Sequence, residues 1–137
     1  MIDKEQMEFL YSEAKKTADK AYAPYSKFRV GAAVLCENGK IITGVNVENR
    51  SFGLTICAER NAVAAAVAAG QRRILALAVC TPDSEEPTGP CGACRQVISE
   101  FMSPDAPVRF AGKGPNQVNT TVGALYPFDS LHELRHE

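Results

Sequence analysis

The spacing of apolar residues predicts three main helices. From about Asp3 to Tyr22, apolar side chains recur every three or four positions, as in an amphipathic helix. Asp3 is placed to cap this helix, and Gln6 completes a capping box. A second helix is expected from Cys57 to Ala69, in an alanine-rich run closed by glycine, and a third from about Cys91 to Met102, directly after a proline.

Between the helices, other apolar segments have the pattern of strands. They are Phe28 to Cys36, Lys40 to Val47, Arg73 to Thr81, Pro107 to Ala111 and, more weakly, Val118 to Val122. Asn38-Gly39 predicts a hairpin turn between the first two. The third is apolar almost throughout, which is typical of a strand buried on both faces. With a short final helix capped by Ser130, this order predicts a layered α/β domain around one mixed sheet.

Composition and charge narrow the class of protein. The 137 residues are 45% hydrophobic and 23% charged, which fits one globular domain spanning residues 1–137. A net charge of -1 gives no reason to expect binding to nucleic acid. Because neither a membrane-spanning run nor a secretory signal is recognisable, we expect a cytoplasmic protein without membrane contact. The five cysteines are then best interpreted as reduced thiols.

Three of the cysteines stand at the starts of two predicted helices. Cys57 precedes Ala58-Glu59, and Cys91 and Cys94 form the motif Pro-Cys-Gly-Ala-Cys. Three thiolates with no obvious fourth protein ligand describe a catalytic zinc site that keeps one open position, so we expect one Zn²⁺ per chain. Glu59 is the natural proton carrier beside such a site.

Three thiolates around Zn²⁺ give a centre of net charge -1, which weakens the acidity of a bound water. The positive ends of the two helices counter this charge. Arg60 and Arg95 follow the cysteines at one-turn spacing, and we expect both to reach thiolate sulfurs and tune the charge of the zinc site.

Asn46 and Glu48 lie two residues apart at the end of a predicted strand, so their side chains share a face. An amide beside a carboxylate suits recognition of a hydroxyl group. Simpler interpretations exist for both, as a turn residue and a solvated charge. Phe28 is by default a core aromatic, and the two arginines are by default surface residues.

Four blocks of the sequence resemble the short, zinc-dependent cytidine deaminases, and the resemblance covers nearly the whole chain. The blocks are Ala23 to Ala33 (APYSKFRVGAA), Gly44 to Asn49 (GVNVEN), Cys57 to Arg60 (CAER) and Pro90 to Val97 (PCGACRQV). The resemblance implies a three-layer α/β/α sandwich around a five-stranded mixed sheet. It also implies hydrolytic deamination of cytidine and 2′-deoxycytidine to uridine and 2′-deoxyuridine with release of ammonia, as in pyrimidine salvage.

The resemblance also assigns roles to residues. The zinc ligands would be Cys57, Cys91 and Cys94, and Glu59 would be the proton shuttle beside zinc-bound hydroxide. The partner would be a small pyrimidine nucleoside. Its base would meet the N–H of Ala58 and the ring of Phe28, its 3′-hydroxyl would meet Asn46 and Glu48, and Arg60 would bond the ligand sulfurs.

The assembly that the resemblance implies is a homotetramer whose active sites are completed across subunits. One departure from the family pattern lies near the C-terminus. The family often has Leu-Leu-Pro, a short spacer and a phenylalanine that reaches a neighbouring site, whereas this chain has Leu125-Tyr126-Pro127-Phe128 without the spacer. That role is therefore not carried over to Phe128.

Three other functions compete with nucleoside deamination. A thiol–disulfide oxidoreductase would use Cys91 and Cys94 at a helix start, but it leaves Cys57-Ala58-Glu59 without a role. A structural zinc module would need a fourth ligand. Deamination of a nucleoside antibiotic such as blasticidin S, or of a base within RNA, fits Glu48 less well than a free ribose hydroxyl does.

Overall fold

The computed structural model describes residues 2–134, and a five-stranded sheet runs through its middle. The strands lie in the order β2-β1-β3-β4-β5. Their bounds are β1 Gly31–Cys36, β2 Ile41–Val45, β3 Ile74–Cys80, β4 Pro107–Ala111 and β5 Gln117–Thr121. Strands β3 and β4 are parallel and the other neighbours are antiparallel, so the predicted mixed sheet is confirmed.

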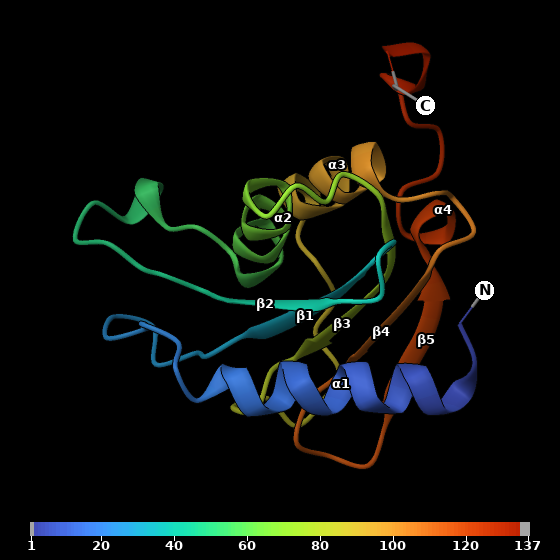
Figure 1. The fold of residues 1–137 in the computed structure, drawn as a ribbon. Helices are drawn as coiled ribbons and strands as arrows, with labels where there is room; N and C mark the ends of the chain where they lie inside the picture. Colours follow the sequence, from blue (N-terminus) through green and yellow to red (C-terminus); the bar gives the residue numbers. More distant parts are fainter. Residues whose placement is uncertain (1, 135–137) are drawn as a thin grey trace.

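Helices cover both faces of this sheet and make three layers (Figure 1). Helix α1 (Lys4–Ala18) lies on one face, and α2 (Ala58–Ala68) and α3 (Gly92–Phe101) lie on the other. Strand β1 shows the alternation directly, because Ala33 and Leu35 belong to the core under α1 while Ala32 and Val34 belong to the core under α2 and α3. The expected α/β/α arrangement is thus confirmed.

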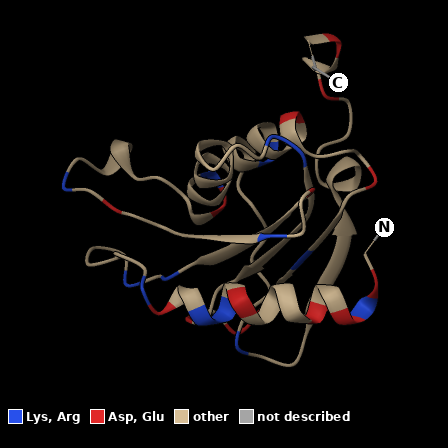
Figure 2. Cartoon of the chain, viewed as in Figure 1, with Lys and Arg blue, Asp and Glu red and all other residues tan. Residues whose placement is uncertain are grey.

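Helix α1 begins and ends for identifiable reasons. The Asp3 side chain accepts a hydrogen bond from the Gln6 backbone N–H, and the Gln6 side chain accepts one from the Asp3 backbone N–H. The predicted capping box is therefore present. The helix ends at Ala18, earlier than the sequence suggested, and Tyr22 instead pairs with Val47 in an isolated parallel bridge. Basic and acidic side chains are interspersed along α1 (Figure 2).

Helix α2 packs against the backbone of β2 because position 44 is glycine. A Cβ added to Gly44 would lie 2.4 Å from the nitrogen of Ala62 and 2.6 Å from the oxygen of Ala58. Both atoms belong to the backbone of α2, so no side-chain rotation relieves the contact. The absence of a side chain at this position therefore sets the distance between α2 and the sheet.

Several element boundaries differ from the prediction. Strand β1 begins at Gly31 because the Phe28 carbonyl and the Val30 N–H bond to the side chain of Asn46 rather than to a neighbouring strand. A four-residue helix, α4 (Val122–Leu125), was not predicted. The loop before α2 contains a 3-10 turn, η1 (Phe52–Leu54). Where a short final helix was predicted after Ser130, the residues described up to position 134 form a 3-10 turn, η2 (His132–Leu134). No helix within residues 2–134 is long and apolar enough to cross a membrane.

Candidate functional site

Three cysteine sulfurs from two separate segments meet where α2 and α3 begin. The Sγ atoms of Cys57 and Cys91 are 3.9 Å apart, and those of Cys91 and Cys94 are 3.6 Å apart. All three sulfurs lie within 4.8 Å of one another. The thiols are free rather than joined in a disulfide, so the predicted cluster is confirmed.

The spacing of the sulfurs fits zinc. A tetrahedral site with Zn–S bonds of about 2.3 Å places its sulfurs roughly 3.8 Å apart, close to the two distances observed. Within residues 2–134, no fourth His, Cys, Asp or Glu donor joins the cluster. Cys57, Cys91 and Cys94 therefore form a zinc site with three protein ligands, the donor set of a catalytic rather than a structural centre.

The sulfurs also lie at the positive ends of two helix dipoles. Cys57 is the N-cap of α2 and Cys91 is the N-cap of α3, both with extended backbone conformations. Neither side chain makes a capping hydrogen bond, which leaves both sulfurs available to a metal. Cys94 follows in the first turn of α3. Partial positive charge at these helix ends offsets the negative charge that the sulfurs carry as metal ligands.

Arg60 adds a full positive charge to the cluster. Its Nη2 donates to Cys57 Sγ at 3.4 Å, as the charge argument predicts. Hydrogen bonds from Cys94 and Arg60 lower the pKa of Cys57 to about 5, while the neighbouring thiolate and burial raise the pKa of Cys94. The thiolate contacts raise the pKa of Arg60, which stays charged beside the cluster.

The prediction that Arg95 also contacts a sulfur needs correction. Its Nε donates to the Pro90 carbonyl at 2.8 Å and its Nη1 to the Leu125 carbonyl at 2.9 Å. Tyr126 reinforces the same connection, since its hydroxyl bonds to Gln96 at 2.6 Å. These donors fasten the C-terminal segment to α3, a contact between distant parts of the chain that helical spacing does not reveal.

Glu59 is buried beside the cluster, with 5% of its surface exposed. Burial raises the pKa of Glu59 to about 7, and the negative charge of Cys57 acts in the same direction. A regular helix would point positions 57 and 59 in different directions. The extended backbone of Cys57 removes that conflict, because this residue precedes the helix.

Asn46 and Glu48 are brought next to Cys57 by an antiparallel bridge. Val47 and Ile56 exchange two backbone hydrogen bonds of 3.0 Å, which places the segment around Glu48 beside the residue before Cys57. Asn61, which the sequence analysis did not single out, secures this junction from α2 by donating to the Val45 carbonyl at 2.8 Å.

Asn46 and Glu48 are also bound to the loop that carries Phe28. Asn46, 6% exposed, accepts from Val30 N and donates to the Phe28 carbonyl, both at 2.8 Å. Glu48 accepts hydrogen bonds from Tyr25 and Ser26, and these contacts, led by the Ser26 hydroxyl, lower its pKa. Phe28 is half-buried.

A second contact holds the same loop at Arg29. The carboxylate of Asp83 accepts from the Arg29 backbone N–H at 2.9 Å and from its guanidinium at 3.0 and 2.8 Å. The Arg29 guanidinium lowers the pKa of Asp83 to about 2. The loop that carries Phe28 is therefore fixed by two carboxylates, Glu48 and Asp83.

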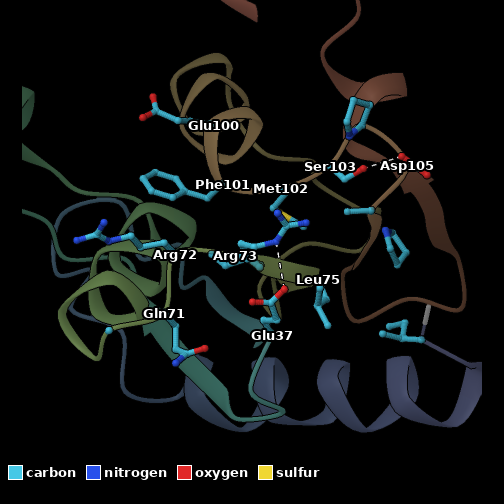
Figure 3. A pocket seen from close by; sticks show the side chains of 16 residues that line it. Glu37, Gln71, Arg72, Arg73, Leu75, Glu100, Phe101, Met102, Ser103 and Asp105 are labelled. Carbon is cyan, nitrogen blue, oxygen red and sulfur yellow. Dashed lines mark hydrogen bonds and ion pairs between the residues drawn. The ribbon is translucent and has the colours of Figure 1, made fainter. Parts of the chain in front are cut away.

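A separate cavity lies at the other ends of α2 and α3 (Figure 3). Its volume is about 940 Å³, and its lining includes Arg72, Glu100 and Asp105. Arg73 and Glu37 form an ion pair of 3.2 Å within it. The cavity contains none of the sulfur ligands. The two buried thiols outside the cluster, Cys36 and Cys80, belong to the hydrophobic core.

Known proteins have sequences and folds similar to those of this chain. The family model described as the cytidine and deoxycytidylate deaminase zinc-binding region matches residues 4–109. A cytidine deaminase of Sporosarcina psychrophila is 49% identical over 121 residues, which are 88% of this chain and 88% of that protein. A cytidine deaminase of Mycobacterium tuberculosis is 47% identical over 130 residues, covering 92% of this chain and 93% of that protein. The crystal structure of cytidine deaminase from Burkholderia pseudomallei has a TM-score of 0.84 at 44% identity and covers 88% and 96% of the two chains.

Proposed function

This chain belongs to the zinc-binding cytidine and deoxycytidylate deaminase family and has cytidine deaminase activity, and we propose that it deaminates both cytidine and 2′-deoxycytidine. The products are uridine or 2′-deoxyuridine and ammonia. The observation that carries the proposal is the three-sulfur cluster with a buried carboxyl group, Glu59, at the start of the same helix as Cys57.

Cys57, Cys91 and Cys94 hold the zinc ion. When bound, zinc supplies the Lewis acidity that lowers the pKa of a water molecule towards about 7. Arg60 withdraws negative charge from Cys57 through its hydrogen bond, and the two helix N-termini act on the sulfurs in the same sense. These contacts preserve the acidity of the centre despite its three thiolate ligands.

Glu59 acts as the proton shuttle. Its carboxylate accepts one proton of the attacking water and delivers it to ring N3 of the cytosine while the water oxygen bonds to C4. Glu59 then takes the remaining proton from the C4 hydroxyl and passes it to the amine, which leaves as ammonia when the C4–N bond breaks. Burial raises the pKa of Glu59 above that of an ordinary carboxyl group, which suits a group that must both accept and donate a proton.

The substrate is held by groups at the start of α2 and in the loops beside it. The N–H of Ala58, at the first position of α2, has no acceptor within the helix and donates to the 2-oxo group of the base. Phe28 packs beside the pyrimidine ring. Asn46 and Glu48 bind the ribose 3′-hydroxyl, since both keep free hydrogen-bonding capacity after their contacts with the loop.

A spectrophotometric assay with a metal measurement tests this proposal. The purified protein is offered cytidine, 2′-deoxycytidine, cytosine, CMP and blasticidin S, and its zinc is determined by mass spectrometry. We expect turnover of the two nucleosides and about one zinc per chain. A metal-free protein that reduces insulin disulfides would instead identify a thiol–disulfide oxidoreductase.

We also propose that the chain assembles as a homotetramer in the cytoplasm. Apolar side chains stand exposed on the loop before α2 and in the C-terminal segment, among them Phe52 at 71% and Phe128 at 100%. Contact with neighbouring subunits would cover them. All five cysteines are free, as expected of a reducing compartment. Light scattering should give four times the 14.8 kDa mass of the chain.

A further inference from the structure

The carboxylate of Glu48 is held by the backbone and side chain of one short loop. Its Oε1 accepts from Tyr25 N at 2.9 Å and from Ser26 N at 3.2 Å, and its Oε2 accepts from the Ser26 hydroxyl. Each carboxylate oxygen offers about two acceptor sites. Both sites of Oε1 are therefore occupied, and one site remains on Oε2.

The Ser26 hydroxyl connects this carboxylate to Phe28. It donates its single hydrogen to Glu48 Oε2 and accepts from Phe28 N at 3.0 Å. The carboxylate and the backbone of the aromatic residue are thus tied to one oxygen atom. A displacement of Ser26 would move both.

The loop adopts this conformation at a cost. Lys27, between Ser26 and Phe28, has φ = 61°, in the left-handed region that residues other than glycine rarely occupy. Such a conformation persists where surrounding contacts determine it. Here the contacts are the bond from Lys27 N to the Ala23 carbonyl at 3.0 Å and the two bonds of the Ser26 hydroxyl.

We infer that Ser26 is a positioning residue for sugar recognition, which rests on the proposed function: its hydroxyl fixes Glu48 so that Oε2 presents its free acceptor site to the 3′-hydroxyl of the nucleoside. Ser26 touches neither the metal ligands nor the reacting atoms. Its effect on the reaction passes through Glu48, and it depends on whether the substrate carries the hydroxyl that Glu48 receives.

Kinetics with two substrates separates this role from a general effect on the loop. Ser26→Ala is compared with the wild type on cytidine and on 3′-deoxycytidine. We expect kcat/KM for cytidine to fall about tenfold, mainly through KM, as for loss of one hydrogen bond to a charged group. For 3′-deoxycytidine we expect a clearly smaller loss, since only the bond from Phe28 N to the Ser26 hydroxyl is then missing. Ser26→Thr keeps the hydroxyl at an exposed position and should restore cytidine kinetics, and Ser12→Ala, which removes a remote exposed hydroxyl of α1, is the matched control.

A titration reports on the same contact without catalysis. In ¹³C NMR spectra, the pKa of Glu48 should rise in Ser26→Ala and stay unchanged in Ser12→Ala, because the Ser26 hydroxyl is the largest cause of its lowered value. An equal penalty on both nucleosides, no penalty on either, or an unchanged Glu48 titration would overturn the role of Ser26. An inactive wild type that shows the expected titration shift would instead overturn the proposed function, and the role in sugar recognition with it.

Discussion

Replacing Gly44 by alanine tests whether the packing of α2 on β2 sets the geometry of the sulfur cluster. The added Cβ would lie 2.4 Å from the nitrogen of Ala62, whereas ordinary contacts begin at 3.4 Å. Helix α2 must therefore withdraw by about 1 Å, the difference between these distances. Cys57 and Glu59 move with α2, while Cys91 and Cys94 belong to α3.

Two magnitudes follow from this displacement. Overpacking of this kind lowers the free energy of unfolding by about 1–3 kcal/mol. Metal–ligand distances tolerate only about 0.2 Å, so zinc affinity should fall. A misplacement of about 1 Å costs on the order of 100-fold in catalysis, and kcat/KM should decrease accordingly.

Gly53→Ala is the matched control, because a Cβ there meets no atom within 4 Å. Both variants are compared with the wild type by zinc content per chain, urea unfolding and cytidine turnover. We expect Gly53→Ala to resemble the wild type in all three. If Gly44→Ala keeps wild-type zinc content, stability and turnover, the helix does not need the glycine and the reasoning is wrong.

Three further predictions address the proton shuttle, the metal and the loop. Glu59→Gln should keep zinc and fold but lose turnover by roughly 10²–10⁴-fold or more, measured as ammonia release; near wild-type release would contradict the role of Glu59. Removal of zinc by a chelator should abolish activity and lower the melting temperature, and added zinc should restore both; activity that survives complete removal would argue against a catalytic metal. Asp83→Asn should destabilise the protein near neutral pH, where the wild-type carboxylate is paired with Arg29. Because the folded pKa of Asp83, about 2, lies below its unfolded value of about 4, this stabilisation is complete above pH 4 and is lost as the pH falls towards 2. The gap in melting temperature should therefore narrow between pH 5 and pH 3, and a constant gap would show that charge is not its cause.

The elements with strong periodicity or definite turn chemistry were predictable from the sequence. The capping box of Asp3 and the turn at Gly39, where φ is 91°, were both identified from local residues. The start of β1 was not, because it depends on a hydrogen bond from Asn46, a residue distant in sequence. The four residues of α4 carry too short a pattern to distinguish from a loop.

The candidate site also has features that the sequence predicted and features that it did not. The three cysteines were predicted to meet because their motifs open two helices, and the structure brings them together. Arg60 and Arg95 have similar spacing from a cysteine, yet among the contacts described only Arg60 has a hydrogen bond to a sulfur. Arg95 instead donates to the carbonyls of Pro90 and Leu125. The only signal that pointed to Ser26 was its place within the first of the four blocks, since a loop serine has no periodicity of its own.

Cys57 and Cys91 occupy the N-cap positions of α2 and α3 but satisfy none of the helix-end amides. Without its metal, the chain is expected to have two frayed helix starts side by side, each short of roughly the 1 kcal/mol that a good cap contributes. A single ion that draws both caps together would order two helices in one event. Metal binding would then stabilise the fold as well as supply the catalytic centre.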